Sequence, residues 1–499
     1  MSVNIFVDSY GGNVIGAVAD GEKLLEYRIE KKNKTVTIGS IFKGRVENVL
    51  AGMQAAFVSV GLARNGYLSA TDMLMDKTEL VGKVEIPSIL NLKEGDEIMV
   101  QAVKDPAGNK GVRLTSNVSF AARNVVFMPT IDFVGVSRRI TDEKTREKLM
   151  ALAESIKPKG QGIIIRTAAE NSSKSEIKRE LNLLIKQYEE IVEKFNSSRA
   201  ETCIFEEGNV AIRLIRDVYN SKIDKFIVGD KEIYGSVLDY AKRIDVELKK
   251  KLRLYDKKVD MFKFYGLEKE VSALLSNTVQ LSSGGYIVID KTEALISIDV
   301  NTGKYTGSDN LEDTVFTTNL EAAEEIARQL RLRNLSGMII VDFIDMESEE
   351  HKEKLLEVLA SNLEKDREKC TLVGMTPLGL VEITRKKRRR ESASMLVKSC
   401  PYCQGTGVIQ SNDYTVMRIR TGLLDLFADG YETAIIDLNI EIADYILAKK
   451  LLQKDVDKIW KGKRIYVIPH KTYHQHFFLI KGDNERVIEL PDNAVLLYS

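Results

Sequence analysis

Two apolar segments of this chain each end in an aspartate, and these aspartates are the side chains best placed to do chemistry. Residues 296–301 read Ile-Ser-Ile-Asp-Val-Asn, and residues 338–342 read Met-Ile-Ile-Val-Asp. A carboxylate at the tip of a hydrophobic strand is costly to remove from water unless a cation or a strong hydrogen-bond donor faces it. Asp299 and Asp342, with one predicted helix between them, therefore indicate a divalent-metal site.

The ligand types indicate which metal would bind. Hard carboxylate oxygens without clustered histidines favour Mg²⁺ or Mn²⁺, and Mg²⁺ takes one or two carboxylates together with waters and substrate phosphate oxygens. This arrangement suits hydrolysis of a phosphate ester, in which the metal activates water and neutralises developing charge. Asn301 follows Asp299 on the same strand face, where its amide could orient the carboxylate or a bound water. The alternative is that both aspartates are strand-end caps or turn residues.

A second candidate metal site lies near residue 400. Cys400 and Cys403 are separated by two residues and precede a glycine-rich turn, as in half of a zinc ribbon. Structural zinc takes four ligands, and the sequence has no second pair with this spacing. His474 and His476 are distant in sequence, and we interpret them as a surface feature. One zinc ion shared by two chains would make a dimer; the alternative, a thioredoxin-like dithiol, is disfavoured because no helix is predicted after the motif.

Length and composition bound the class of protein. At 499 residues the chain is too long for one core, and its 44% hydrophobic and 29% charged residues are ordinary for a folded protein. The formal net charge is zero, so contact with nucleic acid would depend on local patches of charge. No stretch approaches the roughly 18 apolar residues of a membrane span. Four cysteines form no disulfide framework, which favours a reducing, cytoplasmic location.

The first part of the chain is rich in short predicted strands. Residues 1–30 read as a meander, and residues 35–115 hold five short strands that suit a small OB-type barrel. Such a barrel binds single-stranded nucleic acid by stacking bases on aromatic side chains within a basic groove. Phe57 and Tyr67 are the candidate stacking residues, and the alternative for Phe57 is a place in the core. The candidate phosphate contacts are Lys43, Lys104, Lys110 and Arg113.

Helices and strands alternate in the rest of the chain. Apolar periodicity predicts helices over residues 141–156 and 174–196, and Ser173 with Glu176 forms a capping box at the start of the second. A further helix is predicted over residues 310–334, between the two aspartate strands.

A strand end between the first two helices carries side chains suited to a phosphate. Residues 162–165 predict a buried strand that ends at Arg166 and Thr167, with Arg138 and Arg139 upstream. Guanidinium and hydroxyl groups are good phosphate donors. The alternative is structural, because arginine and threonine are common at strand ends.

Basic residues concentrate around the second aspartate strand. The helix before it carries Arg328, Arg331 and Arg333, which would face RNA or solvent. Residues 385–390 read Arg-Lys-Lys-Arg-Arg-Arg. A run of like charge is usually solvated and mobile, but beside a catalytic unit it would attract a polyanion. We favour contact with a nucleic acid, which the family resemblance given next implies is RNA.

Three motifs resemble those of a known enzyme family. The segments ISIDVNTGKYTG at residues 296–307, SGMIIVDFIDM at residues 336–346 and CPYCQGTG at residues 400–407 resemble the ribonuclease E/G family of bacterial endoribonucleases. The match covers almost the entire chain and is closest to the short form of the family, which has no long C-terminal scaffold.

The resemblance implies a role for each candidate site. Asp299 and Asp342 would hold the catalytic Mg²⁺ with support from Asn301, and Cys400 and Cys403 would share a structural Zn²⁺ with a second chain. The RNA-binding residues of the barrel would be Phe57, Tyr67, Lys104 and Lys110. The sensor for a 5′-monophosphate on the RNA would be Arg166, Thr167, Arg139 and Val126.

The resemblance also implies a multidomain α/β fold with an inserted all-β OB-fold barrel. A discontinuous ribonuclease-H-like domain would be structural, and a DNase-I-like domain would be catalytic. The expected ranges are 1–34 and 211–275 for the ribonuclease-H-like domain, 35–117 for the barrel, 118–210 for the 5′-end sensor, 276–396 for the DNase-I-like domain, 397–412 for the zinc link and 413–499 for a small C-terminal α/β domain.

The expected function is Mg²⁺-dependent cleavage of single-stranded RNA that leaves 5′-phosphate and 3′-hydroxyl ends. The resemblance adds rRNA processing and mRNA decay, a preference for 5′-monophosphorylated RNA, and a homodimer or tetramer. Two alternatives belong to other classes: a non-catalytic RNA-binding assembly protein, and a DNA nuclease or repair factor. Comparing Mg²⁺-dependent cleavage of RNA and DNA oligomers separates the three.

Overall fold

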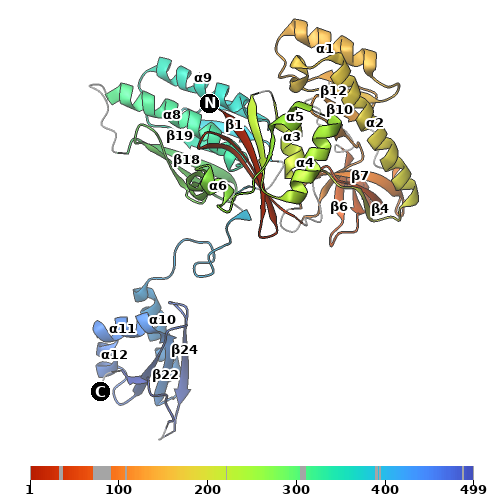
Figure 1. The fold of residues 1–499 in the computed structure, drawn as a ribbon. Helices are drawn as coiled ribbons and strands as arrows, with labels where there is room; N and C mark the ends of the chain where they lie inside the picture. The colour runs from red at the N-terminus through yellow and green to blue at the C-terminus, as the bar shows by residue number, and fades with distance from the viewer. Residues whose placement is uncertain are drawn as a thin grey trace. The chain divides into compact units, whose positions relative to one another are not determined.

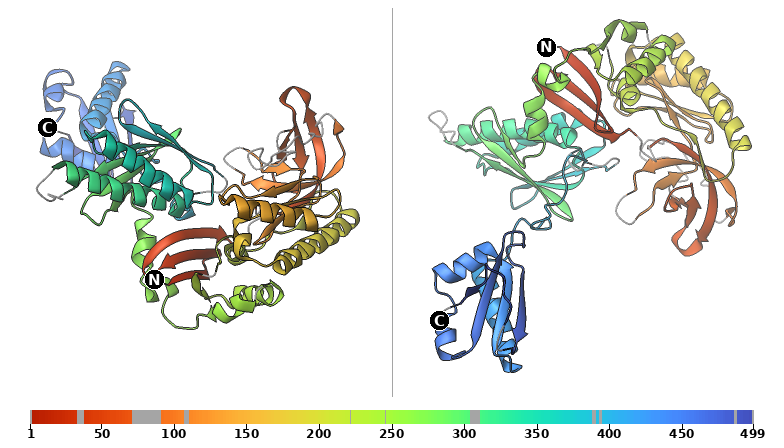
Figure 2. Two further views of the ribbon diagram at one scale, coloured as in Figure 1. Left: turned by 90° about the horizontal axis from the view of Figure 1, so that it is seen from above. Right: turned by 60° about the horizontal axis from the view of Figure 1, so that its bottom comes forward.

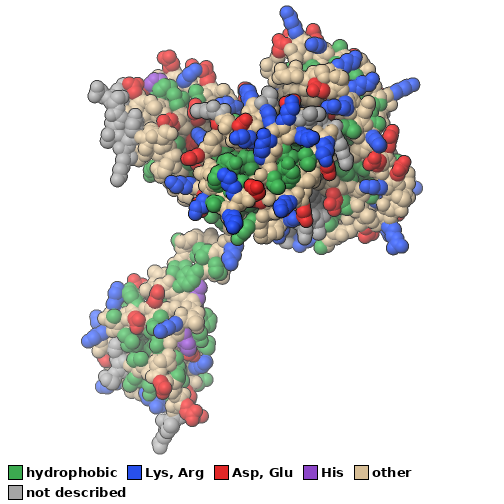
Figure 3. All heavy atoms as spheres, in the orientation of Figure 1, with side chains coloured by type: hydrophobic (Ala, Val, Ile, Leu, Met, Phe, Trp, Pro, Cys, Tyr) green, Lys and Arg blue, Asp and Glu red, His purple; other side chains and the backbone are tan. Residues whose placement is uncertain are grey.

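The computed structural model has two compact units, residues 1–397 and 398–499 (Figure 1). It describes residues 2–32, 38–70, 91–106, 110–220, 222–244, 246–303, 311–387, 391–392, 395–485 and 488–497. Over the face of the first unit that Figure 3 shows, Lys and Arg side chains are spread among Asp and Glu side chains. Among the described helices, none is long and apolar enough to cross a membrane.

The first sheet combines the N-terminal meander with strands from much later in the chain. Its strand order is β15-β14-β1-β2-β3, and β14 runs parallel to β1. The strands are β1 (Val3–Tyr10), β2 (Asn13–Asp20), β3 (Lys23–Lys31), β14 (Ile223–Val228) and β15 (Leu252–Leu254). The helices of this region are α3 (Val210–Asp217), α4 (Lys231–Ile244), α5 (Val246–Lys251), α6 (Met261–Phe264) and α7 (Glu268–Ala273).

The predicted barrel is confirmed. Five strands follow the order β4-β5-β6-β8-β7, and pairing of β4 with β7 closes them around a core that includes Val46, Leu68 and Val100. The strands are β4 (Ile41–Leu50), β5 (Ala55–Ser59), β6 (Gly66–Ser69), β7 (Glu97–Lys104) and β8 (Arg113–Thr115). A short helix, η1 (Ala51–Met53), follows β4, and β13 (Thr202–Phe205) pairs with the edge of β4. Residues 35–37, 71–90 and 107–109 of the predicted range lie outside the described residues.

A small four-stranded sheet follows the barrel, with the order β11-β12-β10-β9. The strands are β9 (Phe120–Ala121), β10 (Val125–Met128), β11 (Val134–Val136) and β12 (Gly162–Ile165), and the helices are α1 (Glu143–Ile156), η4 (Thr167–Asn171) and α2 (Lys174–Ser197). The capping box predicted for Ser173 and Glu176 is present at the start of α2. Asp142 caps α1, so that helix begins two residues later than predicted.

The sheet that carries both aspartate strands has the order β16-β17-β18-β19-β21-β20. Its strands are β16 (Thr278–Gln280), β17 (Tyr286–Lys291), β18 (Leu295–Asn301), β19 (Gly337–Asp342), β20 (Cys370–Met375) and β21 (Leu380–Arg385). Two helices, α8 (Leu311–Leu332) and α9 (Glu349–Glu364), pack side by side on this sheet (Figures 1 and 2). Their apolar side chains and alternate residues of β18 and β19 form one core.

Arg328 of α8 and Arg333, the residue after its end, are buried, so the prediction that they face RNA or solvent is wrong for both, whereas Arg331 is partly exposed. Arg328 donates to Glu325, to Glu270 and to the backbone oxygen of Leu24, and it is 8% exposed. Arg333 donates to Gln329 and to the backbone oxygens of Ser276 and Ala273. Arg331 donates to the backbone oxygen of Asn362. These bonds join α8 to neighbouring segments of the first unit.

The first arginine of the basic run is also buried. Arg385 is 5% exposed, and its Nε lies 2.8 Å from Asp366 Oδ2 in a pair that water hardly reaches. Its other donors bond to Asn334 Oδ1 and to the backbone oxygen of Leu335. Contact between Arg385 and RNA, which the charge run suggested, is therefore wrong; residues 388–390 of the run lie outside the described part of the chain.

The second unit is a small α/β fold around a core of its own. Its sheet has the order β24-β22-β23-β25, and β22 runs parallel to β23. The elements are α10 (Asn412–Ala428), β22 (Thr433–Asn439), α11 (Ile440–Ala448), α12 (Gln453–Lys458), β23 (Arg464–His470), β24 (Phe478–Asp483) and β25 (Val495–Leu496).

The buried pair leads to a stability prediction. Asp366→Ala leaves the Arg385 guanidinium without its counter-ion in a dry interior, which should lower the free energy of unfolding of the first unit by about 3–5 kcal/mol. Differential scanning calorimetry would detect this as a lower Tm. Glu357→Ala breaks an exposed pair with Lys354 on α9 and is the matched control, for which we expect little change. Similar losses in both variants would contradict the assignment.

Candidate active site

Asp299 and Asp342 are direct neighbours on two parallel strands. β18 pairs with β19 in a register that places Asp299 opposite Asp342. Adjacent strands lie about 4.8 Å apart, so the two carboxylates leave the sheet side by side. Both are exposed, whereas the flanking Ile298, Val300 and Val341 are buried against the helices. The pair therefore lies on the sheet face opposite α8 and α9.

Asn301 supports the first of these aspartates. Its Nδ2 donates a hydrogen bond to Asp299 Oδ2 at 2.8 Å. This bond holds the Asp299 side chain through Oδ2, and an ion could then bind at Oδ1. A ligand carboxylate held by a neighbouring donor is common at metal sites.

The ligand oxygens at this site fit Mg²⁺ or Mn²⁺ better than a metal that needs many protein ligands. Two carboxylates supply hard oxygen ligands, and waters and phosphate oxygens can complete the octahedral shell of Mg²⁺. Within the described ranges, no group of three or more His, Cys, Asp or Glu side chains is close enough to hold an ion. The fit therefore depends on a coordination shell completed by waters and, when RNA is bound, by its phosphate oxygens.

The glycines beside this site shape a close backbone approach. A Cβ on Gly303 would lie 2.4 Å from the backbone oxygen of Gly284, and one on Gly285 would lie 2.7 Å from the backbone oxygen of Asn301. The Ser283 N–H donates to Glu321 Oε2. Residues 283–285 therefore form the turn that leads into β17, and the Ser283 N–H already has a protein partner. Residues 304–307 of the first motif lie outside the described ranges.

Four barrel residues form a stripe across neighbouring strands. Phe57 lies opposite Tyr67, Tyr67 opposite Arg113, and Arg113 opposite Lys104. The Phe57 and Tyr67 rings meet edge to face with centroids 5.9 Å apart. All four side chains are partly exposed, while Ala56 and Val58, on either side of Phe57, are buried in the barrel. Phe57 is therefore a surface aromatic and not a core residue. Aromatic side chains next to positively charged ones suit the binding of single-stranded nucleic acid. Lys110 is exposed near the same strands.

Lys43 does not belong to this surface. Its ammonium group bonds to Glu97 and to the backbone oxygen of Ser198, and it lies over the Phe195 ring. It is 8% exposed. The prediction that Lys43 contacts phosphate is therefore wrong, because its charge is already neutralised inside the protein.

The four predicted sensor residues gather at one end of the small sheet. β10 runs antiparallel and β11 parallel to β12, with Val126 opposite Ile164. Arg139 follows β11, and Arg166 and Thr167 follow β12, so all three leave the sheet at the end where β10 begins. Arg139 donates to the backbone oxygen of Asp366.

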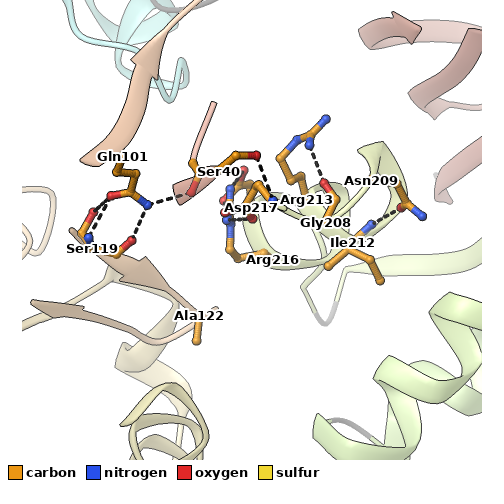
Figure 4. A network of polar contacts seen from close by, with 12 residues as sticks. Ser40, Gln101, Ser119, Ala122, Gly208, Asn209, Ile212, Arg213, Arg216 and Asp217 are labelled. Carbon is orange, nitrogen blue, oxygen red and sulfur yellow. Dashed lines mark hydrogen bonds and ion pairs between the residues drawn. The ribbon is translucent and has the colours of Figure 1, made fainter. Parts of the chain in front are cut away.

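Arg166 is held in place by protein partners. Its Nη1 donates to the backbone oxygen of Ala122 at 2.7 Å, and its Nη2 lies 3.2 Å from Asp217 Oδ1. Figure 4 shows Asp217 next to Arg216, which binds the same carboxylate. Burial acts to raise the pKa of Asp217, but Arg216 and then Arg166 outweigh it and hold that pKa well below its usual range. The Asp217 carboxylate is therefore charged, and Arg166 keeps a partly exposed guanidinium beside it.

A glutamine joins the barrel to this region. Gln101 of β7 donates to the backbone oxygens of Gly39 and Ser119 and accepts from the Ser119 N–H, as Figure 4 shows. It is 4% exposed, so these bonds are shielded from water.

The cysteine motif forms a turn suited to a thiolate. The Gly407 N–H donates to Cys403 Sγ at 3.4 Å, and the backbone N–H groups of Gly407 and Gly405 lower the pKa of Cys403. Both glycines have positive φ, which side-chain-bearing residues rarely adopt. This geometry would suit zinc ligation by Cys400 and Cys403.

His474 is not remote from this turn, contrary to the sequence interpretation. Its ring stacks on Tyr402 with centroids 4.1 Å apart, and its Nε2 lies 2.6 Å from the Tyr402 backbone oxygen. The Tyr402 carbonyl accepts this hydrogen bond, so His474 stabilises the cysteine turn through its contacts with Tyr402.

A nucleic-acid-binding type of barrel and a pair of aspartates on an open sheet face together indicate an enzyme that acts on nucleic acid. Comparison with known proteins identifies the family. The model of the Ribonuclease E/G family matches residues 119–388. Ribonuclease G of Haemophilus influenzae is 37% identical over 93% of this chain and 96% of its own length, and ribonuclease G of Escherichia coli K12 is 38% identical over 96% and 99%. Ribonuclease E of Haemophilus influenzae is 33% identical over 97% of this chain and 52% of its own length.

The chain belongs to the ribonuclease E/G family, and it is an endoribonuclease. Both predictions are confirmed. The roles of the individual site residues stay predictions, which the geometry above makes specific enough to test.

The bond from Asn301 gives the first of these tests. Asn301→Ala removes the donor that orients Asp299, and we expect RNA cleavage to slow by about 10–100-fold, the usual effect of losing a group that supports a metal ligand. Initial rates on a single-stranded RNA oligomer would measure it. Ser297→Ala alters the same exposed strand face two residues before Asp299 and is the control. An Asn301→Ala rate equal to the control would exclude the supporting role.

Proposed function

We propose that this endoribonuclease hydrolyses single-stranded RNA with a divalent ion, Mg²⁺ or Mn²⁺, bound by Asp299 and Asp342. The observation that carries the proposal is the direct pairing of these two residues on an open sheet face, with Asn301 bonded to one of them. The products would be a 5′-phosphate and a 3′-hydroxyl, because water and not the RNA 2′-hydroxyl would be the nucleophile.

The chain's own residues would prepare this chemistry. When bound, Mg²⁺ would activate water and neutralise charge on the phosphate. Asp299 and Asp342 would present oxygens from a rigid pair of strands, so little reorganisation would be needed as charge develops. Asn301 would bond to Oδ2 of Asp299 and so orient Oδ1 toward the ion. The helices lie on the opposite face, which leaves the aspartate face accessible to a long polymer.

The barrel would hold the RNA strand. Phe57 and Tyr67 are adjacent, partly exposed rings on which bases could stack, and Lys104 and Arg113 continue the same stripe with positive charge. Exposed Lys110 would add a phosphate contact. Stacking and phosphate contacts both tolerate any base sequence, which suits an enzyme with many substrates.

Further parts of the proposal follow from family membership. Like the ribonuclease G and ribonuclease E relatives, the protein would process RNA, and we propose rRNA maturation and mRNA decay in the cytoplasm with preference for 5′-monophosphorylated ends. The first sheet would be a ribonuclease-H-like domain, and the aspartate sheet a DNase-I-like domain. Cys400 and Cys403 of two chains would share one Zn²⁺ and make a homodimer, which could pair again into a tetramer.

Loss of either metal ligand tests the central proposal. Asp299→Asn or Asp342→Asn should reduce cleavage by about a thousandfold or more, because each removes several kcal/mol of transition-state stabilisation. RNA binding, measured by fluorescence anisotropy, should survive because the barrel is intact. Asp290→Asn changes an exposed acid on neighbouring β17 and is the matched control. Rates within about tenfold of wild type would refute the metal assignment.

Replacing Arg166 tests the 5′-end sensor. If its guanidinium binds a terminal phosphate, Arg166→Ala should slow cleavage of 5′-monophosphorylated RNA by at least about tenfold, since such charge-assisted bonds contribute ~1.5–3 kcal/mol. Cleavage of the same RNA with a 5′-hydroxyl should hardly change. Because Arg166 also binds Asp217, thermal unfolding must be measured in parallel. Equal losses on both substrates would assign Arg166 a structural role.

Metal content tests the shared zinc. Wild-type protein should contain about one zinc ion per two chains, because zinc takes four thiolates and each chain offers one close pair. The double variant Cys400→Ser, Cys403→Ser should lose the zinc and shift toward monomer in analytical ultracentrifugation. Cys203→Ser removes an exposed thiol elsewhere and is the control. One zinc per chain in a stable monomer would contradict the model.

A further inference from the structure

A buried asparagine of α8 clamps the backbone just after Asp342. Asn319 has no exposed surface. Its Nδ2 donates to the backbone oxygen of Ile344 at 2.8 Å, and its Oδ1 accepts from the Ile344 N–H at 3.1 Å. One side chain thus satisfies both backbone groups of a residue that lies two positions after Asp342.

The same helix face holds the far end of this segment. Glu312 and Phe316 precede Asn319 by seven and three residues, which places all three on one side of α8. Glu312 Oε1 accepts from the Ser348 N–H at 3.2 Å, and Phe316 stacks on His351 with centroids 4.1 Å apart. Residues 343–348 are therefore fastened to α8 at both ends.

The clamp acts on the backbone and not on the ion. Asp342 leaves the sheet on the exposed face, whereas α8 and Asn319 lie on the covered one. Asp342 is the last residue of β19, so pairing with β18 and β21 holds it from one side. On its other side the chain leaves the sheet, and the bonds to Ile344 take over there.

We propose that Asn319 is a positioning residue for the divalent ion held by Asp342. This inference rests on the proposed metal-dependent cleavage. A loosened segment after Asp342 would let the carboxylate swing away from Asp299, and groups that orient metal ligands typically control affinity or activity by about 10–100-fold. A polar side chain buried only for stability would leave the ion's affinity unchanged.

The test uses Mn²⁺ alone as the probe, with the full-length protein. Asn319→Leu removes both hydrogen bonds at similar side-chain volume. We expect Mn²⁺, titrated without RNA and followed by electron paramagnetic resonance, to bind about tenfold more weakly. The Mg²⁺ concentration for half-maximal cleavage should rise by a similar factor. Cleavage at saturating Mg²⁺ should largely recover, and RNA binding without divalent ions should stay as in wild type.

Three further variants complete the measurement. Thr318→Val changes the adjacent residue, which is also fully buried but whose hydroxyl bonds to the backbone oxygen of Thr314 within α8. It should behave as wild type. Asp342→Asn is the reference for a site that has lost its ion. Glu312→Ala, at a partly exposed position, loosens the other end of the segment with little risk to folding and should also weaken Mn²⁺ binding.

The outcomes separate the two proposals. If Asp342→Asn loses the ion while Asn319→Leu binds Mn²⁺ as wild type does, the positioning role is overturned and the metal site stands. If Asp342→Asn binds Mn²⁺ and cleaves RNA normally, the metal site itself is overturned. If Asn319→Leu does not fold, Glu312→Ala decides, since weaker Mn²⁺ binding supports the clamp and unchanged binding overturns it.

Discussion

Parallel pairing of β18 with β19 is the interaction on which the candidate active site depends. Two carboxylates repel each other, and the pairing keeps them adjacent because backbone hydrogen bonds fix the register. Alternation along each strand then buries Ile298 and Val341 against the helices and leaves the aspartates on the open face. A slip of one residue would exchange these two faces, so the apolar core selects the register that also assembles the site.

The helix layer that covers the aspartate sheet is held in place by charged groups as well as by apolar packing. Arg328 of α8 and Arg333 directly after it are buried, and their partners are carboxylates, an amide and backbone oxygens of distant segments. Removing guanidinium groups from water is costly, and such groups are tolerated when most of their donors are satisfied. The bond from Arg328 to the backbone oxygen of Leu24 ties α8 to the N-terminal meander. The helix that clamps the segment after Asp342 is thereby fixed on its other side too.

The sequence predicted local features well and long-range partners poorly. The barrel and the capping box at Ser173 follow from periodicity and neighbouring residue types, which a sequence displays directly. Lys43 and Arg385 were misjudged because their partners, Glu97 and Asp366, are identified only once the chain has folded. His474 lies beside Tyr402 for the same reason. Asn319 was missed entirely, since an asparagine within a helix has no local signal that it will bind a backbone segment 25 residues later.

Strand register positions both the row of barrel residues and the pair of aspartates. Phe57, Tyr67 and Arg113 align because three neighbouring strands hold them in register, as β18 and β19 hold Asp299 and Asp342. In both places the functional side chains occupy the positions that alternate with core residues, so packing in the core fixes what the surface presents. Side chains on flexible loops would lose conformational entropy on meeting RNA or an ion, whereas these lose little because folding has already fixed them. Register therefore accounts for both where these groups lie and how rigidly they are held.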